Sequence, residues 1–439
     1  MDQATSADPA VQRQLDRLWA LSPGADILGL ERITALLDRL GNPERALPPV
    51  LHVAGTNGKG STCAFLRAAI EAAGLQTHVY TSPHLVRFNE RIRLAGTLID
   101  DAPLAELLGE VLDIGADIGA SFFEVTTAVA FLAFSRTPAD ACVVEVGLGG
   151  RLDATNVVAA PLVCGIAQLG IDHQAFLGDR IEQIAAEKAG IAKPGVPLVT
   201  LHYPARIANR IGQAARAAGA PWIARDGGWN ASASGGKLHY QDAAGALDLP
   251  LPRLPGAHQA VNAALAVAML RHQRTLAIPP PALRAAMGWA EWPARLQRLT
   301  GGSLVALLPD DTELWLDGGH NPAAARAIAH FFRHRLAPGR RFHILLGMLA
   351  NKDLPGFLEP FAGSKAVIHP IAVSGHAAHA PDAIAAAAAA LGLAVGAAGN
   401  PEAALRAIAA EADGPVTILI GGSLYLAGEA LALNGTPPG

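Results

Sequence analysis

The chain has 439 residues, about three times the length of an average domain of roughly 150 residues, so we expect two or three domains with sizeable cores. Hydrophobic residues make up 51% of the chain and charged residues 16%, which is typical of a globular protein. A net charge of -4 gives no reason to expect nucleic acid as a partner, and we expect small-molecule partners instead.

The mean hydropathy of +0.28 raises the question of a membrane span. The longest apolar run extends from Ala383 to Ala398, but Gly392 and Gly396 interrupt it and it is shorter than the roughly 20 residues that a spanning helix needs. We interpret it as a buried helix followed by a strand. The first residues carry both charge signs and do not resemble a secretory signal, so we expect a cytoplasmic protein without a membrane partner.

In the first part of the chain, short apolar runs alternate with longer amphipathic stretches. The runs are PVLHVAG, THVYTS, ACVVEVG, PLVCGIAQLG and VPLVTL. This alternation is typical of β-α-β units and predicts a largely parallel sheet. Its three cysteines, Cys63, Cys142 and Cys164, have apolar neighbours and are expected to pack in the core.

The pattern changes between Gly227 and Pro255, where short segments rich in Gly, Asp and Pro predict a small antiparallel sheet, followed by a helix near His258 to His272. The Pro- and Gly-containing joint EWPARLQRLTGG comes next. A second series of apolar runs then begins, with LVALLP, ELWLDGG, RRFHILLGM, KAVIHPIAV and VTILIGG. We therefore predict two α/β domains, residues 1–298 and a smaller one at 299–439, with the boundary near Arg298.

The segment GTNGKGS lies between a predicted buried strand and a predicted helix that ends at Gly74. A glycine-rich turn at a helix N-terminus presents N–H groups to an anion, and Lys59 adds a full charge. The strict phosphate-loop pattern G-x-x-x-x-G-K-[ST] is not met, because Gly60 separates Lys59 from Ser61. An ordinary turn with a solvated lysine is the alternative. The order strand, turn, helix favours phosphate binding by Thr56, Asn57, Gly58, Lys59, Gly60 and Ser61.

A bound phosphate needs a divalent cation, which prefers oxygen ligands. Three predicted strands end in polar residues that would meet at one edge of the sheet: Ser82, Glu145 with Asp153, and Asp172 with His173. A structural ion pair is the alternative for Glu145. Lys188, on a predicted helix, reads as a surface lysine when taken alone.

The motifs together resemble those of folylpolyglutamate synthase/dihydrofolate synthase, in the Mur ligase superfamily, from about Leu30 to Gly428. They are, in order, GTNGKGS, TSPHL, FNERIR, FFEVTTA, VEVGLGGRLDATN, GIDH, AAEKAGI, ARLQ, LDGGHNP, GMLANKD and GGSLYLAG. The resemblance implies an ATP-dependent amide ligase with an N-terminal ATP-binding domain, a C-terminal Rossmann-like domain, and the active site between them. The Pro/Gly-containing joint would be the hinge.

The resemblance also implies two magnesium sites. Ser82 and Glu145 would hold the ion that bridges the β- and γ-phosphates, and His173 would hold a second. Lys188 matches the lysine that is carbamylated in this superfamily, which would convert a cation into an oxygen ligand.

Further roles are implied for residues along the rest of the chain. Asn262, Arg295 and Asp317 match nucleotide contacts, and Asp317, His320 and Ser423 match the region for the incoming glutamate. The pterin-bearing substrate would lie near Phe122, Phe123, Glu124, Leu152 and Asp153. Some motifs depart from the family pattern; for example, Gly319 stands where alanine is usual.

The implied reaction makes an acyl phosphate from a pteroate or folate carboxylate and ATP, which the amine of L-glutamate then attacks. Lys59, Lys188, Asp317 and His320 would be catalytic, with Asp317 or His320 orienting or deprotonating the amine. His320 has an alternative, because HNP is also a good helix start through Asn321 and Pro322. We expect dihydropteroate, folates and L-glutamate as small-molecule partners, both ligase activities, and a monomer.

Two other functions remain open. A nucleotide-binding switch would not need the second domain with LDGGHNP and GGSLYLAG. A Mur-type ligase for a peptidoglycan precursor would commonly carry an additional N-terminal domain, whereas about 48 residues precede the first predicted strand. The sequence therefore favours the folate branch.

Overall fold

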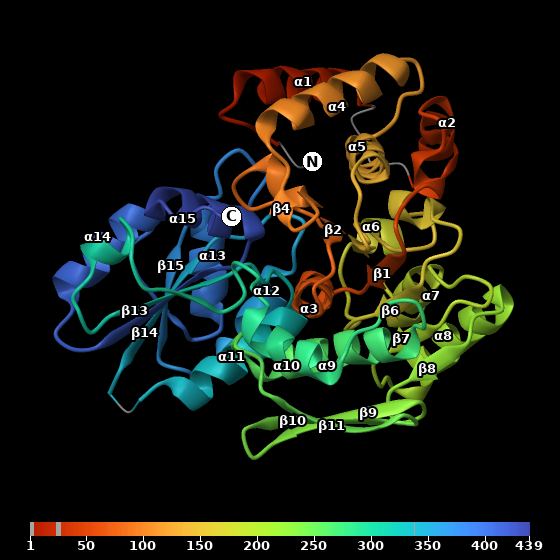
Figure 1. Cartoon of the computed structure of the whole chain (residues 1–439). Coiled ribbons are helices and arrows are strands. Elements are labelled where there is room, and N and C mark those ends of the chain that lie inside the picture. Colours follow the sequence, from red (N-terminus) through yellow and green to blue (C-terminus); the bar gives the residue numbers. More distant parts are fainter. Residues whose placement is uncertain (1–3, 23–27, 338) are drawn as a thin grey trace. The chain divides into compact units, whose positions relative to one another are not determined.

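The structure is a computed structural model that describes residues 4–22, 28–337 and 339–439 (Figure 1). It divides into two compact units. Unit 1 consists of Met1–His84, Phe88–Arg253 and His258–Glu291, and unit 2 consists of Leu85–Arg87, Leu254–Ala257 and Trp292–Gly439. Each unit is a sheet with helices on both faces, so the predicted α/β class is confirmed.

Unit 1 contains a sheet of eight strands in the order β4-β3-β2-β5-β1-β6-β7-β8. Six of them, from β2 to β8 in that order, run parallel, and β3 and β4 form an antiparallel edge. The strands are β1 (Val50–Ala54), β2 (Thr77–Tyr80), β3 (Ile92–Leu94), β4 (Thr97–Leu98), β5 (Ala141–Glu145), β6 (Val163–Ile166), β7 (Leu198–Thr200) and β8 (Trp222–Ala224). All residues of β1 and β5 are buried, as expected of central parallel strands covered on both faces.

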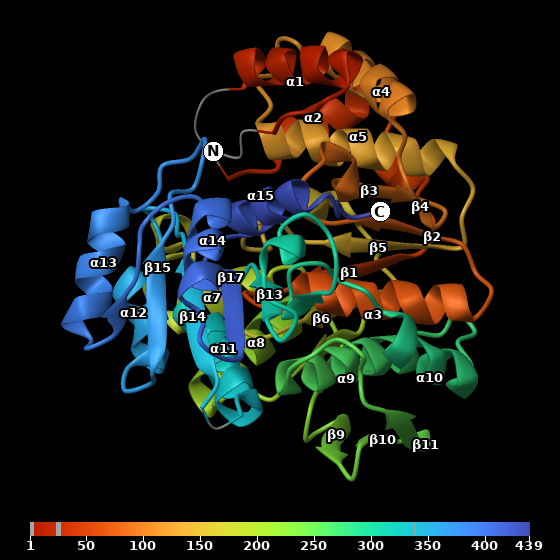
Figure 2. The ribbon, with the colours of Figure 1, turned by 90° about the vertical axis from the view of Figure 1, so that its left-hand side faces the viewer.

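Helices form layers on both faces of this sheet, as Figure 2 shows. On one side lie α5 (Phe122–Arg136) and, beyond it, α1 (Pro9–Leu21), α2 (Glu31–Arg39) and α4 (Asp101–Ile114). On the other lies α3 (Lys59–Ala72), with α9 (Ala257–His272) and α10 (Pro280–Trp289) beneath it. The short α6 (Gln174–Leu177), α7 (Ile181–Ala189) and α8 (Ala205–Ala218) follow β6 and β7.

The predicted antiparallel sheet is confirmed as β9 (Trp229–Ser234), β10 (Lys237–Asp242) and β11 (Gly245–Pro250). The predicted helix after it is α9, which carries Arg271. The Arg271 guanidinium donates two hydrogen bonds of 2.6 Å to the Asp242 carboxylate and lies over the Tyr240 ring. This small sheet is therefore fastened to α9.

Unit 2 contains a six-stranded sheet in the order β12-β13-β17-β14-β15-β16. The strands are β12 (Gln297–Leu299), β13 (Glu313–Asp317), β14 (Arg341–Leu346), β15 (Ala366–Pro370), β16 (Ala394–Val395) and β17 (Val416–Gly421). Alternate residues face opposite cores: Trp315 and Leu419 pack with α11 (Pro322–Arg335), α12 (Leu354–Leu358) and α13 (Pro381–Ala390). Leu316 and Ile420 pack with α14 (Pro401–Glu411) and α15 (Leu424–Asn434).

Two expectations for unit 2 are wrong in detail. The run LVALLP is not a strand but contains a 3₁₀ turn at Val305–Leu307. The carbonyl and side-chain oxygens of Asn434 accept the Ser303 and Leu304 N–H groups, which are therefore not available to a strand ladder. The alanine-rich run does form a helix and a strand, yet it is not buried. In α13 only Ile384 and Ala388 are buried, since it packs by one stripe against the sheet.

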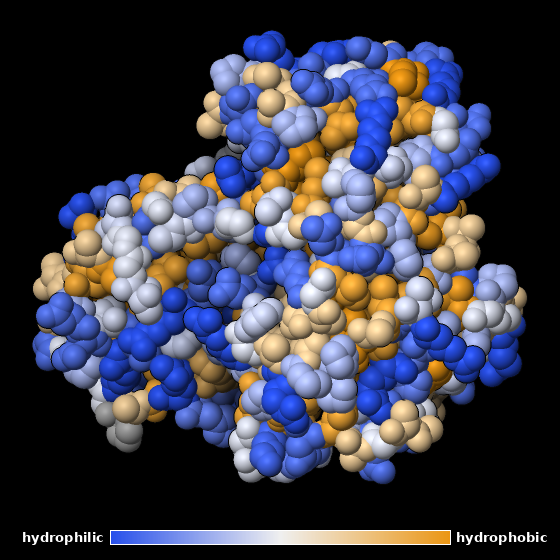
Figure 3. All heavy atoms as spheres, viewed as in Figure 1, coloured by the Kyte–Doolittle hydropathy of each residue, from blue (hydrophilic) through white to orange (hydrophobic). Residues whose placement is uncertain are grey.

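No helix in residues 4–22, 28–337 and 339–439 is long and apolar enough to cross a membrane. Polar and apolar residues are interspersed over the face in Figure 3. The three cysteines are free and buried, as the sequence predicts. Large exposed apolar side chains include Trp289 (61%) and Phe176 (43%).

Candidate functional site

The glycine-rich turn joins β1 to α3 in the middle of the unit 1 sheet. Gly58 caps α3 with φ +84°, and a Cβ at this position would lie 2.4 Å from the Asn262 Oδ1 atom. The turn therefore needs glycine for two reasons, the left-handed backbone and the close approach of a side chain from α9. The helix begins at Lys59, so the N–H groups of its first turn have no partners within the helix.

The turn is held from the strand next to it. The N–H groups of Thr56 and Asn57 both donate to the Gln168 carbonyl oxygen, at 2.8 and 3.1 Å, and the Thr56 hydroxyl lies 3.0 Å from the Gly170 carbonyl oxygen. Gln168 and Gly170 follow β6, which pairs with β1. Backbone hydrogen bonds thus fix the shape of the turn.

Lys59 and Glu145 lie close together at the carboxyl ends of the parallel strands β1 and β5. The Lys59 Nζ atom lies 3.8 Å from the Glu145 Oε1 atom, and the two side chains are 17% and 5% exposed. Glu145 is the last residue of β5, the neighbour of β1 on the other side. The Lys59 ammonium can bind phosphate oxygens and the Glu145 carboxylate can bind a divalent metal ion, and the two groups lie side by side.

The other predicted metal ligands also follow parallel strands of this sheet. Ser82 lies two residues beyond β2 and is half-buried, and the exposed His173 precedes α6 with φ +52°. Among the described residues, no group of three His, Cys, Asp or Glu side chains could hold a metal ion. A serine hydroxyl and the Glu145 carboxylate are oxygen donors, and this set fits magnesium, which keeps several waters when it is bound.

Lys188 is buried, so its interpretation as a surface lysine is wrong. Its side chain lies in α7 with 4% exposure, and burial, followed by the nearby Lys59 charge, lowers its pKa to about 7. Asp172 and Asp153 act in the opposite direction. Near neutral pH a large share of the molecules therefore has an uncharged Lys188 amine. The uncharged amine is the form that reacts with electrophiles.

Two of the predicted substrate residues, Phe122 and Glu124, lie at the start of α5 and contact neighbouring side chains. The Phe122 ring is buried between Trp19 and Phe88, at centroid distances of 5.0 and 6.0 Å. Glu124 forms a capping box with Ser121 and an ion pair of 3.0 Å with Arg32. These contacts account for the packing of α5.

Phe123 and Asp153 converge on the loop after Glu145. A Cβ at Gly147 would lie 2.3 Å from the Phe123 ring, so the ring covers this glycine. The Asp153 Oδ2 atom accepts the Leu148 N–H group at 2.8 Å. Leu152, beside Asp153, is half-buried.

In unit 2, Asp317 ends β13 and organises the turn that carries Arg295. Its Oδ2 atom accepts the Leu296 N–H group at 2.8 Å, and its Oδ1 atom accepts the Gly319 N–H group at 2.7 Å. Ala294 and Leu296 have φ +54° and +46°. The bond from Leu296 to Asp317 and the 2.9 Å bond from the Gly318 N–H group to the Ala294 carbonyl oxygen hold this backbone in place. The Arg295 side chain lies against the residue after Asp317, because a Cβ at Gly318 would be 2.9 Å from the Arg295 Nη1 atom.

Two helices begin at the same edge of the unit 2 sheet. The Asn321 side chain caps α11, as the HNP pattern predicts, and Ser423 caps α15. They follow the parallel neighbours β13 and β17. The His320 Nδ1 atom lies 3.0 Å from the Gly318 carbonyl oxygen. Helix N-termini together with His320 can attract a carboxylate.

Several residues of these sites were not singled out by the sequence analysis. His376 stacks on Tyr425 at 3.8 Å, two residues beyond Ser423, and His52 and Thr155 lie behind Asp153. His52 gave one usable signal, a polar residue inside an apolar strand. Its partner is 103 residues away, which periodicity cannot reveal.

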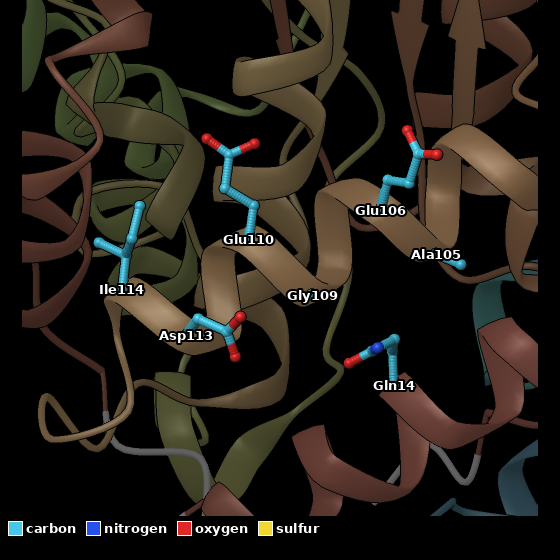
Figure 4. Close-up of a pocket in the computed structure, with 7 residues that line it drawn as sticks. All are labelled: Gln14, Ala105, Glu106, Gly109, Glu110, Asp113 and Ile114. Atoms are coloured by element: carbon cyan, nitrogen blue, oxygen red, sulfur yellow. The ribbon is translucent and has the colours of Figure 1, made fainter.

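A pocket of about 580 Å³ lies between α1 and α4 and contains none of the predicted site residues (Figure 4). Its lining includes Gln14, Glu106, Glu110 and Asp113. Glu110 pairs with Arg136 at 2.6 Å and Asp113 with Arg17 at 2.5 Å, so these two carboxylates serve to connect helices.

Comparison with known proteins shows the family of this chain. Residues 304–424 match the family of the Mur ligase, glutamate ligase domain. The dihydrofolate synthase/folylpolyglutamate synthase of Bacillus subtilis is 34% identical over 78% of this chain and 80% of its own length. The protein of the same description from Escherichia coli is 36% identical over 75% of this chain and 74% of its own length.

Solved structures show the same likeness. Escherichia coli FolC in complex with DHPP and ADP has a TM-score of 0.87 and 31% identity, with 98% of both chains covered. A bifunctional folylpolyglutamate synthase/dihydrofolate synthase with Mn, AMPPNP and L-glutamate bound has a TM-score of 0.83 and 30% identity, and the match covers 98% of this chain and 99% of that one.

The fold and the relatives define an ATP-dependent ligase of the Mur ligase type. Within that class, the chain belongs to the dihydrofolate synthase/folylpolyglutamate synthase family, whose members are ligases that form C–N bonds. The resemblance inferred from the motifs is confirmed, and the switch and the peptidoglycan ligase are the less favoured alternatives.

Proposed function

We propose that this protein joins L-glutamate both to dihydropteroate and to the γ-carboxylate of folates, through an acyl phosphate. The observation that carries the proposal is the Lys59–Glu145 pair beside the glycine-rich turn, with the buried Lys188 near the same charges. The relatives named above support the choice of substrates. Residues 1–298 would be the ATP-binding domain and residues 299–439 the glutamate-ligase domain.

The nucleotide would lie along the turn. The N–H groups at the start of α3 and the Lys59 ammonium would bind the β- and γ-phosphate oxygens, with Thr56, Asn57, Gly58, Gly60 and Ser61 around them. Asn262 lies against Gly58, where it would sense the nucleotide, and Arg295 and Asp317 are further candidate contacts.

Magnesium, when bound, would neutralise charge that develops on the transferring phosphoryl group. Ser82 and Glu145 would hold it at one site, and His173 and Lys188 at a second. Lys188 supports this assignment because a buried, uncharged amine can add carbon dioxide and release a proton, which leaves an anionic carbamate as an oxygen donor. Lys59 would spread the remaining phosphoryl charge.

The incoming glutamate would be held in the region of Asp317, His320 and Ser423. The N-termini of α11 and α15 would attract its carboxylates, and His320 or Asp317 would orient its amine or accept its proton. The pterin-bearing substrate would lie against Phe122, Phe123, Glu124, Leu152 and Asp153. A monomeric, cytoplasmic enzyme completes the proposal.

The direct test is ADP release by the purified protein with Mg-ATP and L-glutamate. Dihydropteroate is supplied in one reaction and tetrahydrofolate in another, and Lys59→Ala is the control. Turnover with both acceptors is the expected result, with a loss of at least about 100-fold for Lys59→Ala because it removes a charge that stabilises the transition state. If neither acceptor stimulates ADP release above the control, the folate function is wrong.

A further inference from the structure

A continuous chain of buried hydrogen bonds connects the middle of β1 to the loop that follows β5. The His52 Nε2 atom lies 2.8 Å from the Thr155 Oγ1 atom, and the Thr155 hydroxyl donates to the Asp153 Oδ1 atom at 2.5 Å. The Asp153 Oδ2 atom then accepts the Leu148 N–H group at 2.8 Å. The side chains of His52, Thr155 and Asp153 are at most 2% exposed, so water does not compete for these bonds.

The direction of the chain follows from its donors. Asp153 also accepts the Thr155 N–H group at 3.0 Å, so its carboxylate receives three hydrogen bonds from this protein. Because the single hydroxyl proton of Thr155 is directed at Asp153, its lone pair is left for a proton on His52 Nε2. Burial lowers the pKa of His52 to about 3, so its ring is neutral and carries one such proton.

The far end of these hydrogen bonds is the loop of residues 147–150. Gly147 lies under the Phe123 ring, and Gly150 lies so close to α7 that a Cβ would be 2.9 Å from the Lys188 carbonyl oxygen. Between these two contacts, the Asp153 bond to Leu148 N–H fixes the loop backbone. The loop therefore contacts Phe123 of α5 at one end and α7, the helix that carries Lys188, at the other.

We propose that His52 and Thr155 are positioning residues that act through Asp153 to set the shape of the 147–150 loop on the pterin side of the site. The inference rests on the function proposed above and gives Asp153 a specific role: it holds the backbone that the substrate meets. None of these bonds involves the phosphate-binding turn, where the Thr56 and Asn57 N–H groups donate to the Gln168 carbonyl oxygen instead.

The test uses paired variants of the full chain. Thr155→Val removes the hydroxyl at nearly constant volume, whereas Thr155→Ser keeps it. His52→Leu removes the ring N–H group, whereas His52→Gln retains a side-chain N–H donor. The matched control is Thr200→Val. Thr200, the last residue of β7, is a fully buried threonine of unit 1 like Thr155, and its hydroxyl has hydrogen bonds to Leu201 and Trp222.

Steady-state kinetics give the first readout. We expect Thr155→Val and His52→Leu to raise KM for dihydropteroate about tenfold, the factor that one hydrogen bond to a charged group typically provides, with kcat reduced less than about threefold. The KM for Mg-ATP stays near the wild-type value. Thr155→Ser, His52→Gln and Thr200→Val stay close to wild type for both substrates.

Amide hydrogen exchange of peptides that cover residues 146–152 gives a second readout that needs no substrate. Exchange should be faster by about tenfold in Thr155→Val and His52→Leu, because the Leu148 N–H group loses its fixed acceptor. Thr155→Ser and Thr200→Val should exchange as wild type does.

The two readouts separate the outcomes. Unchanged exchange in Thr155→Val overturns the proposal, and so does faster exchange with unchanged KM, or an equal effect in Thr200→Val. Faster exchange with a selective rise in KM, restored by Thr155→Ser, supports it. If wild type uses neither dihydropteroate nor tetrahydrofolate while exchange still responds, the proposed function is wrong and the link from His52 to the loop stands.

Discussion

Burial is the largest cause of the pKa shifts of several residues in this protein, among them His52, Lys188 and His343. His343 and His369 illustrate this in unit 2, where the His343 Nδ1 atom lies 2.9 Å from the His369 Nε2 atom between two strands. Burial and the neighbouring His369 lower the pKa of His343 to about 4, and Arg341 acts in the same direction. Burial also lowers the pKa of His369.

A pH dependence of stability follows from this pair. Between pH 6.5 and about 4 the unfolded chain binds more protons at His343 than the folded chain does, so the free energy of unfolding falls as the pH falls through this range. The slope from this residue is at most about 1.4 kcal/mol per pH unit. His343→Gln should reduce it, as measured by urea unfolding from pH 4 to 7. Equal slopes in the two proteins would contradict the assignment.

At the scale of elements, the turn from β1 to α3 shows how one glycine can meet two demands. Gly58 and Gly74 lie at opposite ends of α3 and have nearly equal φ values of +84° and +81°. A Cβ at Gly58 would meet Asn262, whereas a Cβ at Gly74 would meet no atom within 4 Å. The two positions therefore separate backbone strain from steric contact.

Gly58→Ala and Gly74→Ala form a matched pair. Each should lower the free energy of unfolding by about 1 kcal/mol through the left-handed backbone. Only Gly58→Ala should weaken Mg-ADP binding, by at least about tenfold, because it displaces Asn262 and the turn. Isothermal titration calorimetry together with urea unfolding measures both effects. A comparable loss of ADP affinity in Gly74→Ala would show that the effect is not local to the turn.

The elements also show why part of the fold was predictable. Strands such as β5 and β17 have continuous apolar runs that end at Gly-rich or polar turns, and these local signals predict a parallel sheet. The run LVALLP has the same composition, but Asn434, far along the chain, determines its conformation. The burial of Lys188 and the bond from His52 to Thr155 also depend on distant segments. The local pattern therefore does not reveal that Lys188 is buried, and it does not reveal that His52 and Thr155 are bonded.

At the scale of the whole molecule, each unit has its own sheet and its own cores. Unit 1 contains all three cysteines and unit 2 contains none. Cys63, Cys142 and Cys164 lie in α3, β5 and β6, and burial raises the pKa of each thiol. Thiols with these properties react slowly in the folded protein.

The unfolding of unit 1 should therefore be measurable by thiol modification. A chromogenic thiol reagent should modify no cysteine in the native protein and three in denaturant, because all three are free and buried. In a urea series, pulses of reagent should give a modification curve that coincides with unit 1 unfolding followed by exchange in β1. Modification of a thiol under native conditions would contradict the burial of that residue.

The same burial makes the chain a convenient host for a single spectroscopic label. A cysteine introduced at Ala386, on the exposed side of α13, would be the one thiol open to a maleimide dye while the native cysteines stay in place. Fluorescence or spin-resonance measurements could then follow unit 2 without a cysteine-free background. Proteins with reactive surface thiols need several substitutions before such an experiment, whereas this chain needs one.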